Sequence, residues 1–408
     1  MKCGLLGEHL GHSFSPQIHR LLADYSYELF EMPEDEVASF LRSDSFDAIN
    51  VTIPYKKTVM PYLDEISDEA KRIGSVNTIT RLANGGLRGD NTDYFGFSYM
   101  LDKSGIELSG KKVLILGSGG ASETAKTVCG DRGARAVIII SRSGKDNYTN
   151  LSNHRDAEVI VNTTPVGMFP NNGVSAVELS EFPALCGALD MIYNPAKTKF
   201  LLDAEKLGIP NINGLCMLVA QAKKACEIFL GTKLDNSVID KITKSIERET
   251  GNIVLVGMPG CGKTSLGVIL SEKLGREIID TDELIVKNAG ITIPEIFAKF
   301  GEGRFRGLEH EAICEAGKQS GKIIATGGGA VTRAENYEPL HQNGKIFFIR
   351  RNIDELPTDG RPISQTTNLT ELYNKRLPMY RNFCDAEISN DRTISETADE
   401  IIKIYQGG

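Results

Sequence analysis

The sequence lacks the features that mark a membrane-spanning, secreted or nucleic-acid-binding protein. None of its apolar runs approaches the ~20 residues that a bilayer-spanning helix requires. The N-terminal segment MKCGLLGEHLGHSFSP is too short and too polar for a secretory signal. The formal net charge is −8, whereas proteins that bind phosphate backbones are usually basic. We therefore expect a cytoplasmic protein with neither a membrane nor a nucleic acid as its partner.

Cysteine and histidine are too scattered to build a disulfide framework or a metal centre. The eight cysteines form no C-x-x-C pair, and the six histidines form no H-E-x-x-H or H-x-H set. We expect free thiols in a reducing compartment and no transition metal. The composition is otherwise that of a globular protein, and 408 residues exceed the roughly 150 of one ordinary domain, so two domains are expected.

Short apolar runs alternate with amphipathic stretches along the whole chain, which predicts an α/β fold with parallel strands. The expected strands are 2–6, 48–52, 112–116, 136–140, 159–162, 188–192, 253–256, 323–326 and 346–349. The expected helices are 16–24, 121–130, 215–230, 263–274 and 293–300. The polar stretch 235–251 has no strand pattern, and we interpret it as the end of a helix followed by a junction.

This junction predicts a boundary between residues 1–246 and 247–408, and each half carries its own glycine-rich segment. In the second half, an apolar strand runs into GMPGCGKTS at 257–265 and then into a helical pattern, which matches G-x-x-x-x-G-K-[ST]. Glycines let successive N–H groups point at phosphates, Lys263 reaches the β- and γ-phosphates, and the Thr264 hydroxyl binds Mg²⁺. We expect Gly260, Cys261, Gly262 and Ser265 to complete a P-loop for ATP.

Further motifs follow the P-loop in a fixed order. They are DTD with Asp280 and Asp282, GEGRFRGLE with Arg306, TGGGAV with Gly328 and Gly329, GRPI with Arg361, and NKRLPMYRNFCD with Arg376. A DTD pair or a glycine turn alone would be unremarkable. Together and in this order they resemble shikimate kinases over almost all of 252–405, which implies a P-loop NTPase-like domain.

The resemblance implies a role for each of these residues. Asp282 would accept the proton of the attacking substrate hydroxyl, with Lys263 at the phosphates. Arg306 and Arg376 would hold the substrate carboxylate, and Gly328 and Gly329 would offer N–H groups to the ring hydroxyls. Arg361 would come from a lid, and Asp280 would position the water shell of the metal. The segment between 349 and 376 is shorter than the lid region that is usual in this family.

The first half contains a weaker cofactor signal. The strand 112–116 leads into GSGGAS, in which Gly117, Ser118, Gly119, Gly120 and Ala121 form G-x-G-x-x with serine at the third glycine position. An ordinary tight turn would explain this loop equally well. The end of the next expected strand reads Ser141, Arg142, Ser143. It lacks the carboxylate that binds the ribose of NAD, and it offers an arginine and hydroxyls suited to a 2′-phosphate, which predicts NADP.

Motifs with single polar residues surround this cofactor loop. They are GHSFSPQIH with Ser13 and Ser15, NVTIPYKK with Asn50, Thr52 and Lys56, GSVNT with Asn77, GDNTDYFG with Asp93, DMIYNP with Met191 and Tyr193, and INGLCMLVAQA with Gly214 and Gln221. Each could be structural, since a serine before proline can cap a helix and most lysines are solvated. As an ordered set they resemble shikimate dehydrogenases over about 2–246.

That resemblance implies a substrate subdomain at about 1–100 and 220–246 and a Rossmann-like NADP subdomain at about 101–219. Ser13 and Ser15 would hold the substrate carboxylate. The ring would be lined by Asn50, Thr52, Asn77, Tyr193 and Gln221, with Met191 and Gly214 at the cofactor. Lys56 and Asp93 would be the catalytic pair, with the lysine as proton donor. The short stretch after SRS departs from the family and predicts that a βα element is trimmed.

The product expected of the first half is the substrate expected of the second. The sequence thus predicts a bifunctional enzyme that reduces 3-dehydroshikimate with NADPH and phosphorylates shikimate with ATP and Mg²⁺. One alternative is a metabolite-sensing protein without turnover, which the presence of Lys56, Asp93, Lys263 and Asp282 disfavours. Another is a catabolic dehydrogenase joined to a different kinase, which the SRS segment disfavours. The oligomeric state is left open.

Overall fold

The computed structural model describes residues 1–11, 13–353 and 369–407. The chain packs into two compact units. The first contains Met1–Met168, Val174–Tyr193 and Phe200–Ser245, and the second contains Phe169–Gly173, Asn194–Lys199 and Ile246–Gly408. The domain boundary at 246 and 247 and the subdomain limits stay predictions. Among the described residues, no helix is both long and apolar enough to cross a bilayer.

The first unit begins with a six-stranded sheet in the order β2-β1-β3-β5-β6-β4. Its strands are β1 (Lys2–Gly7), β2 (Ser26–Glu31), β3 (Ala48–Val51), β4 (Glu65–Ile66), β5 (Thr78–Arg81) and β6 (Leu87–Asp90). The expectation of parallel strands throughout is wrong here, because β5 pairs antiparallel with both β3 and β6. A five-residue turn joins β5 to β6, and so short a link can only connect antiparallel strands.

Several helices of the first unit lie between the strands of this sheet or after them along the chain. They are α1 (Ser15–Leu22), α2 (Glu34–Arg42), α3 (Asp68–Ile73), α4 (Asp93–Ser104), α7 (Leu215–Leu230) and the beginning of α8 (Ser237–Thr250). The interpretation of 235–251 as a helix end plus a junction is wrong, because α8 occupies nearly all of it. Ile239, Ile242 and Ile246 are buried at helical spacing and give this polar stretch one apolar face.

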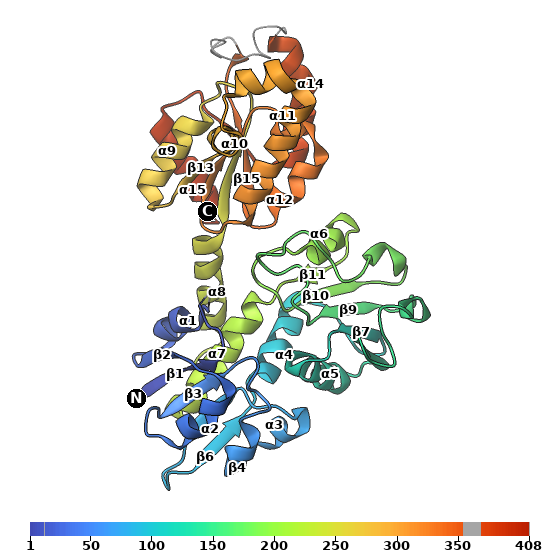
Figure 1. Ribbon diagram of the computed structural model, residues 1–408, viewed down its shortest axis with the longest axis vertical. Coiled ribbons are helices and arrows are strands. Elements are labelled where there is room, and N and C mark those ends of the chain that lie inside the picture. Colours follow the sequence, from blue (N-terminus) through green and yellow to red (C-terminus); the bar gives the residue numbers. More distant parts are fainter. Residues whose placement is uncertain (12, 354–368, 408) are drawn as a thin grey trace. The chain divides into compact units, whose positions relative to one another are not determined.

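A second sheet of this unit is parallel throughout, in the order β11-β10-β9-β7-β8. Its elements are β7 (Lys112–Leu116), α5 (Gly120–Asp131), β8 (Ala136–Ile140), β9 (Val159–Asn162), β10 (Gly187–Asp190), α6 (Lys199–Lys206) and β11 (Asn211–Ile212). Alternate residues of β7 face opposite sides: Val113 and Ile115 pack with α4 and α5, while Leu114 and Leu116 pack with α6. Figure 1 shows these helices on the two faces of the sheet.

The connection from β8 to β9 contains only the four-residue 3₁₀ helix η2 (Leu151–His154) and no α-helix. The predicted trimming of a βα element is therefore confirmed. The chain after β8 consists of a hydrogen-bonded loop where a doubly wound sheet usually has a crossover helix.

The second unit has a five-stranded parallel sheet in the order β13-β14-β12-β15-β16, the fold class that was predicted. Its strands are β12 (Asn252–Val256), β13 (Ile278–Asp280), β14 (Ile323–Ala325), β15 (Gly344–Arg350) and β16 (Ala386–Ser389). Its helices are α9 (Lys263–Leu274), α10 (Thr281–Ala289), α11 (Ile293–Lys318), α12 (Tyr337–His341), α14 (Leu369–Phe383) and α15 (Ile394–Tyr405).

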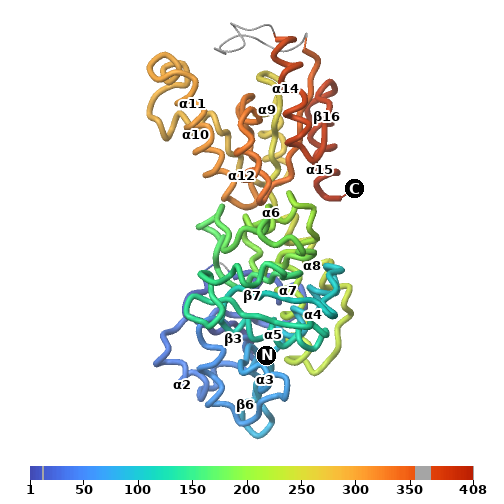
Figure 2. Tube along the Cα trace, turned by 90° about the vertical axis from the view of Figure 1, so that its right-hand side faces the viewer, coloured from blue at the N-terminus to red at the C-terminus, as the bar shows by residue number. Residues whose placement is uncertain are grey.

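The helix expected at 293–300 continues as α11, and its expected end coincides with a kink at Gly301, where φ is 77°. Only glycine adopts this backbone conformation without strain. Figure 2 shows α10 and α11 on one side of the second unit, with α14 and β16 on the other. The P-loop, Asp282 and the glycine loop at 327–329 follow the carboxyl ends of β12, β13 and β14, where open α/β sheets bind their ligands.

Candidate active sites

The P-loop of the second unit joins β12 to α9, and its lysine already has partners. Lys263 is buried, and its Nζ atom donates hydrogen bonds to the carbonyl oxygens of Gly257 at 2.9 Å and Met258 at 3.0 Å. A side chain at Gly257 would bring its Cβ to 2.5 Å from the Ile349 oxygen, so this position requires glycine. The backbone of the P-loop therefore holds the ammonium group of Lys263 in place.

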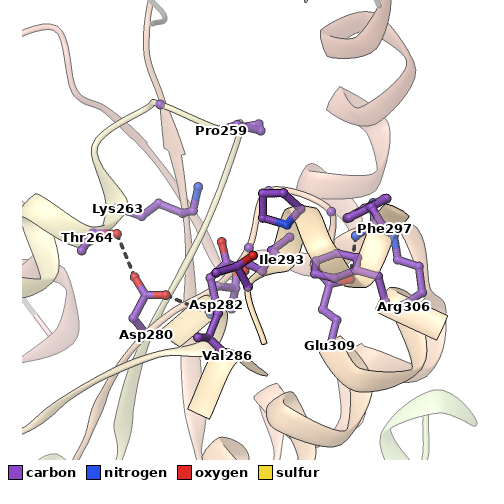
Figure 3. Close-up of a pocket in the computed structure, with 18 of the residues that line it drawn as sticks. Pro259, Lys263, Thr264, Asp280, Asp282, Val286, Ile293, Phe297, Arg306 and Glu309 are labelled. Carbon is purple, nitrogen blue, oxygen red and sulfur yellow. Dashed lines mark hydrogen bonds and ion pairs between the residues drawn. The ribbon is translucent and has the colours of Figure 1, made fainter. Parts of the chain in front are cut away.

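A hydroxyl and a carboxylate meet beside this loop (Figure 3). Thr264 Oγ1 donates to Asp280 Oδ2 at 2.9 Å, while Asp280 Oδ1 accepts from the backbone N–H of Asp282 at 2.9 Å and caps α10. Oxygen ligands of this kind are the ones Mg²⁺ prefers. The pair fits a magnesium ion whose other ligands would be water molecules and phosphate oxygens.

Asp282 is the group best suited to accept a proton. Its Oδ1 atom is buried and has no hydrogen-bond partner in the described part of the chain. Burial, followed by the negative charges of Asp280 and Glu309, raises the pKa of the Asp282 carboxyl to about 6. A carboxylate with such a pKa is ionised at neutral pH and still basic enough to take a proton.

Two buried arginines line the same site. Arg306 Nη1 donates to Glu309 Oε2 at 2.7 Å, and Arg376 Nη1 donates to the Gly328 carbonyl at 3.2 Å. Burial raises the pKa of Glu309, against the opposing charge of Arg306. A Cβ at Gly329 would lie 2.0 Å from Arg306 Nη1, so the glycine loop leaves room for the guanidinium.

These groups enclose a cavity of about 710 Å³. The predicted residues that line it are Gly260, Gly262, Lys263, Thr264, Ser265, Asp280, Asp282, Arg306, Gly328, Gly329 and Arg376. Cys261 is fully buried and is absent from this lining. Arg361 lies outside the described residues. Sequence reasoning missed Glu309, whose position three residues after Arg306 in α11 was its one signal, and also the aromatic wall of Phe297 and Phe305.

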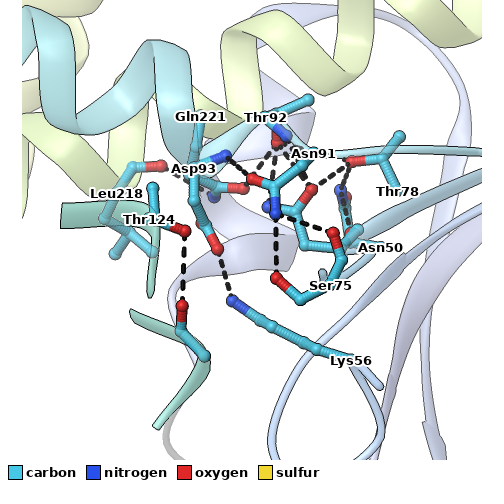
Figure 4. A network of polar contacts seen from close by, with 12 residues as sticks. Asn50, Lys56, Ser75, Thr78, Asn91, Thr92, Asp93, Thr124, Leu218 and Gln221 are labelled. Carbon is cyan, nitrogen blue, oxygen red and sulfur yellow. Dashed lines mark hydrogen bonds and ion pairs between the residues drawn. The ribbon is translucent and has the colours of Figure 1, made fainter. Parts of the chain in front are cut away.

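The first unit contains an ion pair at the expected catalytic position. Lys56 Nζ lies 2.6 Å from Asp93 Oδ2, and both side chains are largely buried. Asp93 is the first residue of α4, and its N–H donates to Asn91 Oδ1 at 3.1 Å. A Cβ at Gly120 would lie 3.8 Å from Lys56 Cδ, so the cofactor loop comes close to the lysine. Figure 4 shows the pair at the edge of a wider polar network.

That network fixes several of the expected substrate residues. Asn77 Oδ1 accepts from the Thr92 N–H at 2.7 Å, and Thr92 Oγ1 donates to Gln221 Oε1 at 3.4 Å. The Asn50 amide is already engaged, since its Oδ1 accepts from Tyr27 at 2.8 Å and its Nδ2 donates to Thr78 Oγ1 at 3.2 Å. The Asn50 side chain, in β3, therefore connects its strand to β2 and β5.

A cavity of about 620 Å³ opens at this edge of the sheet. The predicted residues that line it are Ser13, Ser15, Asn50, Thr52, Lys56, Asn77, Asp93, Ala121, Met191, Tyr193, Gly214 and Gln221. Sequence reasoning missed several further lining residues, among them Glu8, His9, Met168 and Met217. Glu8 and His9 directly follow β1, and a strand end was the signal that could have identified them.

The remaining cofactor residues lie at the carboxyl ends of β7 and β8. Gly117, Ser118, Gly119 and Gly120 connect β7 to α5, and Ser141, Arg142 and Ser143 follow β8. None of these seven residues lines the substrate cavity. The two segments adjoin, because Leu116 pairs with Ile140 and the Gly117 N–H donates to the Ile140 carbonyl at 2.8 Å.

The glycine loop fits a dinucleotide. Gly117 has a φ of 111°, and a Cβ there would lie 2.7 Å from Thr163 Oγ1. A Cβ at Gly119 would meet nothing within 4 Å, so the backbone before the α5 N-terminus is open to a ligand. Free N–H groups at a helix N-terminus bind phosphate.

Comparisons with known proteins match both units. The family described as shikimate kinase matches residues 259–406, and the shikimate dehydrogenase substrate binding domain matches residues 5–79. A shikimate dehydrogenase (NADP(+)) of Clostridium perfringens is 38% identical over 265 residues, which cover 60% of this chain and 97% of the relative.

Solved structures agree with these matches. Shikimate dehydrogenase 1 from Peptoclostridium difficile is 41% identical with a TM-score of 0.56, and the alignment covers 60% of this chain and 97% of that one. A Thermus thermophilus shikimate 5-dehydrogenase in complex with NADP(H) and shikimate is 30% identical with a TM-score of 0.55, over 60% and 99% of the two chains. The chain thus belongs to the shikimate dehydrogenase family and continues into a shikimate kinase domain, which makes it a bifunctional enzyme.

Proposed function

We propose that the chain catalyses two consecutive reactions on one carboxylated ring. The first is the NADPH-dependent reduction of 3-dehydroshikimate to shikimate, and the second is the ATP-dependent phosphorylation of shikimate to shikimate 3-phosphate. The observation that carries this proposal is the 2.6 Å Lys56–Asp93 pair inside a cavity that also reaches the cofactor side of the unit through Ala121. The identity of the relatives as NADP(+)-dependent shikimate dehydrogenases, and the complex of one of them with NADP(H) and shikimate, support the choice of substrates.

In the first reaction, Lys56 holds the proton that the substrate oxygen receives. The Asp93 carboxylate stabilises the charged amine and orients it toward the cavity. Ser13 and Ser15, which line the same cavity, offer hydroxyl groups to the substrate carboxylate. NADPH supplies the hydride when it is bound, and Arg142 and Ser143 select it by its 2′-phosphate.

In the second reaction, Asp282 accepts the proton of the ring hydroxyl that attacks the γ-phosphorus. Its unpartnered Oδ1 atom and its raised pKa support this role. Arg306 and Arg376 bind the substrate carboxylate, a planar anion that suits the guanidinium fork. Lys263 leaves the carbonyl oxygens of the loop and binds the phosphates. Thr264 and Asp280 would hold Mg²⁺, which would neutralise phosphate charge.

A coupled assay tests both steps together. The full chain is supplied with 3-dehydroshikimate, NADPH and Mg-ATP, while NADPH oxidation and the phosphorylated product are followed separately. We expect one product molecule for each NADPH consumed. Consumption of NADPH without product would refute the kinase assignment, and absence of NADPH oxidation would refute the dehydrogenase assignment.

Matched variants connect the assay to the sites. Lys56→Ala should slow NADPH oxidation about 10²-fold or more, while the kinase still phosphorylates added shikimate. Lys57→Ala removes the neighbouring exposed lysine and should leave both activities unchanged. Asp282→Asn should abolish the kinase step alone. Loss of both activities from either active-site variant would instead indicate a folding defect.

A further inference from the structure

The loop that replaces the crossover helix after β8 closes on itself. The Ser141 N–H donates to the Asp146 carbonyl at 3.2 Å, and Ser141 is buried beneath the turn. A Cβ at Gly144 would lie 2.6 Å from Ser141 Oγ, so the Ser141 side chain fills the space beside Gly144. Arg142 and Ser143 lie within this turn and are exposed.

Two asparagine side chains hold the second half of the loop. Asn147 Nδ2 donates to the Gly144 carbonyl at 3.2 Å, and Asn150 Nδ2 donates to the Lys145 carbonyl at 2.9 Å. The Asn147 N–H in turn donates to Asn150 Oδ1 at 2.8 Å. Side-chain amides therefore replace the backbone hydrogen bonds that a helix would have made.

One side-chain pair connects this loop to η2. Asp146 Oδ1 lies 3.0 Å from His154 Nε2, and the His154 side chain is almost completely buried. The contact therefore connects the Asp146 carboxyl group directly to the buried imidazole ring. Because Asp146 also supplies the carbonyl that closes the turn, the imidazole anchors the residue on which the turn depends.

We propose that Asp146 and His154 are a positioning pair that fixes Arg142 and Ser143 for the 2′-phosphate of NADPH. The inference rests on the proposed function, which assigns that phosphate to these two residues. An arginine on an unbraced loop loses conformational freedom when it binds, and a braced turn reduces this cost. With no crossover helix after β8, the Asp146–His154 contact supplies the brace.

Cofactor discrimination is the measurement that tests this role. The ratio of kcat/KM for NADPH to kcat/KM for NADH is determined for wild type, Asp146→Ala, Asp146→Asn and His154→Gln. We expect Asp146→Ala to lower this ratio about tenfold. NADPH should be used less well, because the charge-assisted contact of Arg142 with the 2′-phosphate would be displaced. Asp146→Asn keeps an acceptor oxygen and should retain most of the ratio. Arg155→Ala breaks an exposed ion pair with Glu181 beside the loop and should change nothing.

Inhibition constants add a readout that does not depend on turnover. Adenosine 2′,5′-bisphosphate should inhibit Asp146→Ala about tenfold more weakly than wild type, while adenosine 5′-monophosphate inhibits both equally. Equal weakening of the two inhibitors, or an unchanged cofactor ratio in Asp146→Ala and His154→Gln, overturns the positioning role. A wild type without preference for NADPH would instead refute the proposed function. If Asp146→Ala does not fold, His154→Gln decides the question.

Discussion

Replacing Asp282 by asparagine should stabilise the second unit while it abolishes phosphoryl transfer. The structure raises the pKa of this carboxyl from 3.8 to about 6, because it is buried near the carboxylates of Asp280 and Glu309. Such a difference corresponds to roughly 3 kcal/mol of destabilisation at neutral pH. Although the Oδ1 atom is buried, the residue as a whole is partly open to the cavity, and solvent screening reduces the expected destabilisation to about 2 kcal/mol.

The sign of the pH dependence follows from the direction of the shift. The folded protein binds the Asp282 proton more tightly than the unfolded chain does, so wild type loses stability as the pH rises from about 4 to about 6. Asparagine carries no charge in either state. The advantage of Asp282→Asn should therefore be complete at pH 7.5, smaller at pH 5 and close to zero at pH 4.

Calorimetry of the full chain measures this effect. The transition of the second unit is identified by its shift when ADP is added, because a ligand stabilises only the unit that binds it. At pH 7.5 this transition should move upward in Asp282→Asn. An unchanged or lower transition temperature, or an advantage that is equally large at pH 5, would refute the argument that Asp282 is kept ionised at a cost to folding.

Three further predictions concern activity. Lys56→Ala should lower kcat of the dehydrogenase about 10²-fold or more with little change in KM for 3-dehydroshikimate, in steady-state kinetics; a change confined to KM would contradict a proton-donor role. Gly329→Ala should raise KM for shikimate in the kinase assay about tenfold, because its Cβ displaces the Arg306 guanidinium. The kinase kcat/KM for shikimate should fall below pH 6 with an apparent pKa of about 6 and lose about tenfold at pH 5; a flat profile would remove Asp282 from the base role.

Elements bounded by glycine and filled with apolar residues could be predicted to the residue. Strand β7 and helix α9 have the expected limits, because a buried apolar run before a glycine loop has few alternatives. Strand β2 was missed because it is largely exposed and carries no continuous apolar run. The antiparallel β5–β6 pair could have been predicted, because its turn contains Asn84-Gly85, a dipeptide typical of hairpins. Helix α8 was missed because mostly polar residues surround its one apolar face.

The same limit applies to the candidate sites. Residues within motifs could be placed in the two cavities because their spacing after strand ends fixes their position. Glu309 could not, since its burial results from the contact with Arg306 and from the glycine loop opposite it. The pairing of Asp146 with His154 across a folded loop also depends on tertiary structure and has no periodic pattern in the sequence.

Because the chain reverses between β5 and β6, the residues of the dehydrogenase site and the turn that joins the two strands lie far apart. The reversal brings Asn77, just before β5, and Asp93, just after β6, to one edge of the sheet, while the turn at 82–86 lies at the far edge. A fluorescent label or a short peptide tag inserted in that turn would be remote from the dehydrogenase cavity and could report on the protein without disturbing catalysis there.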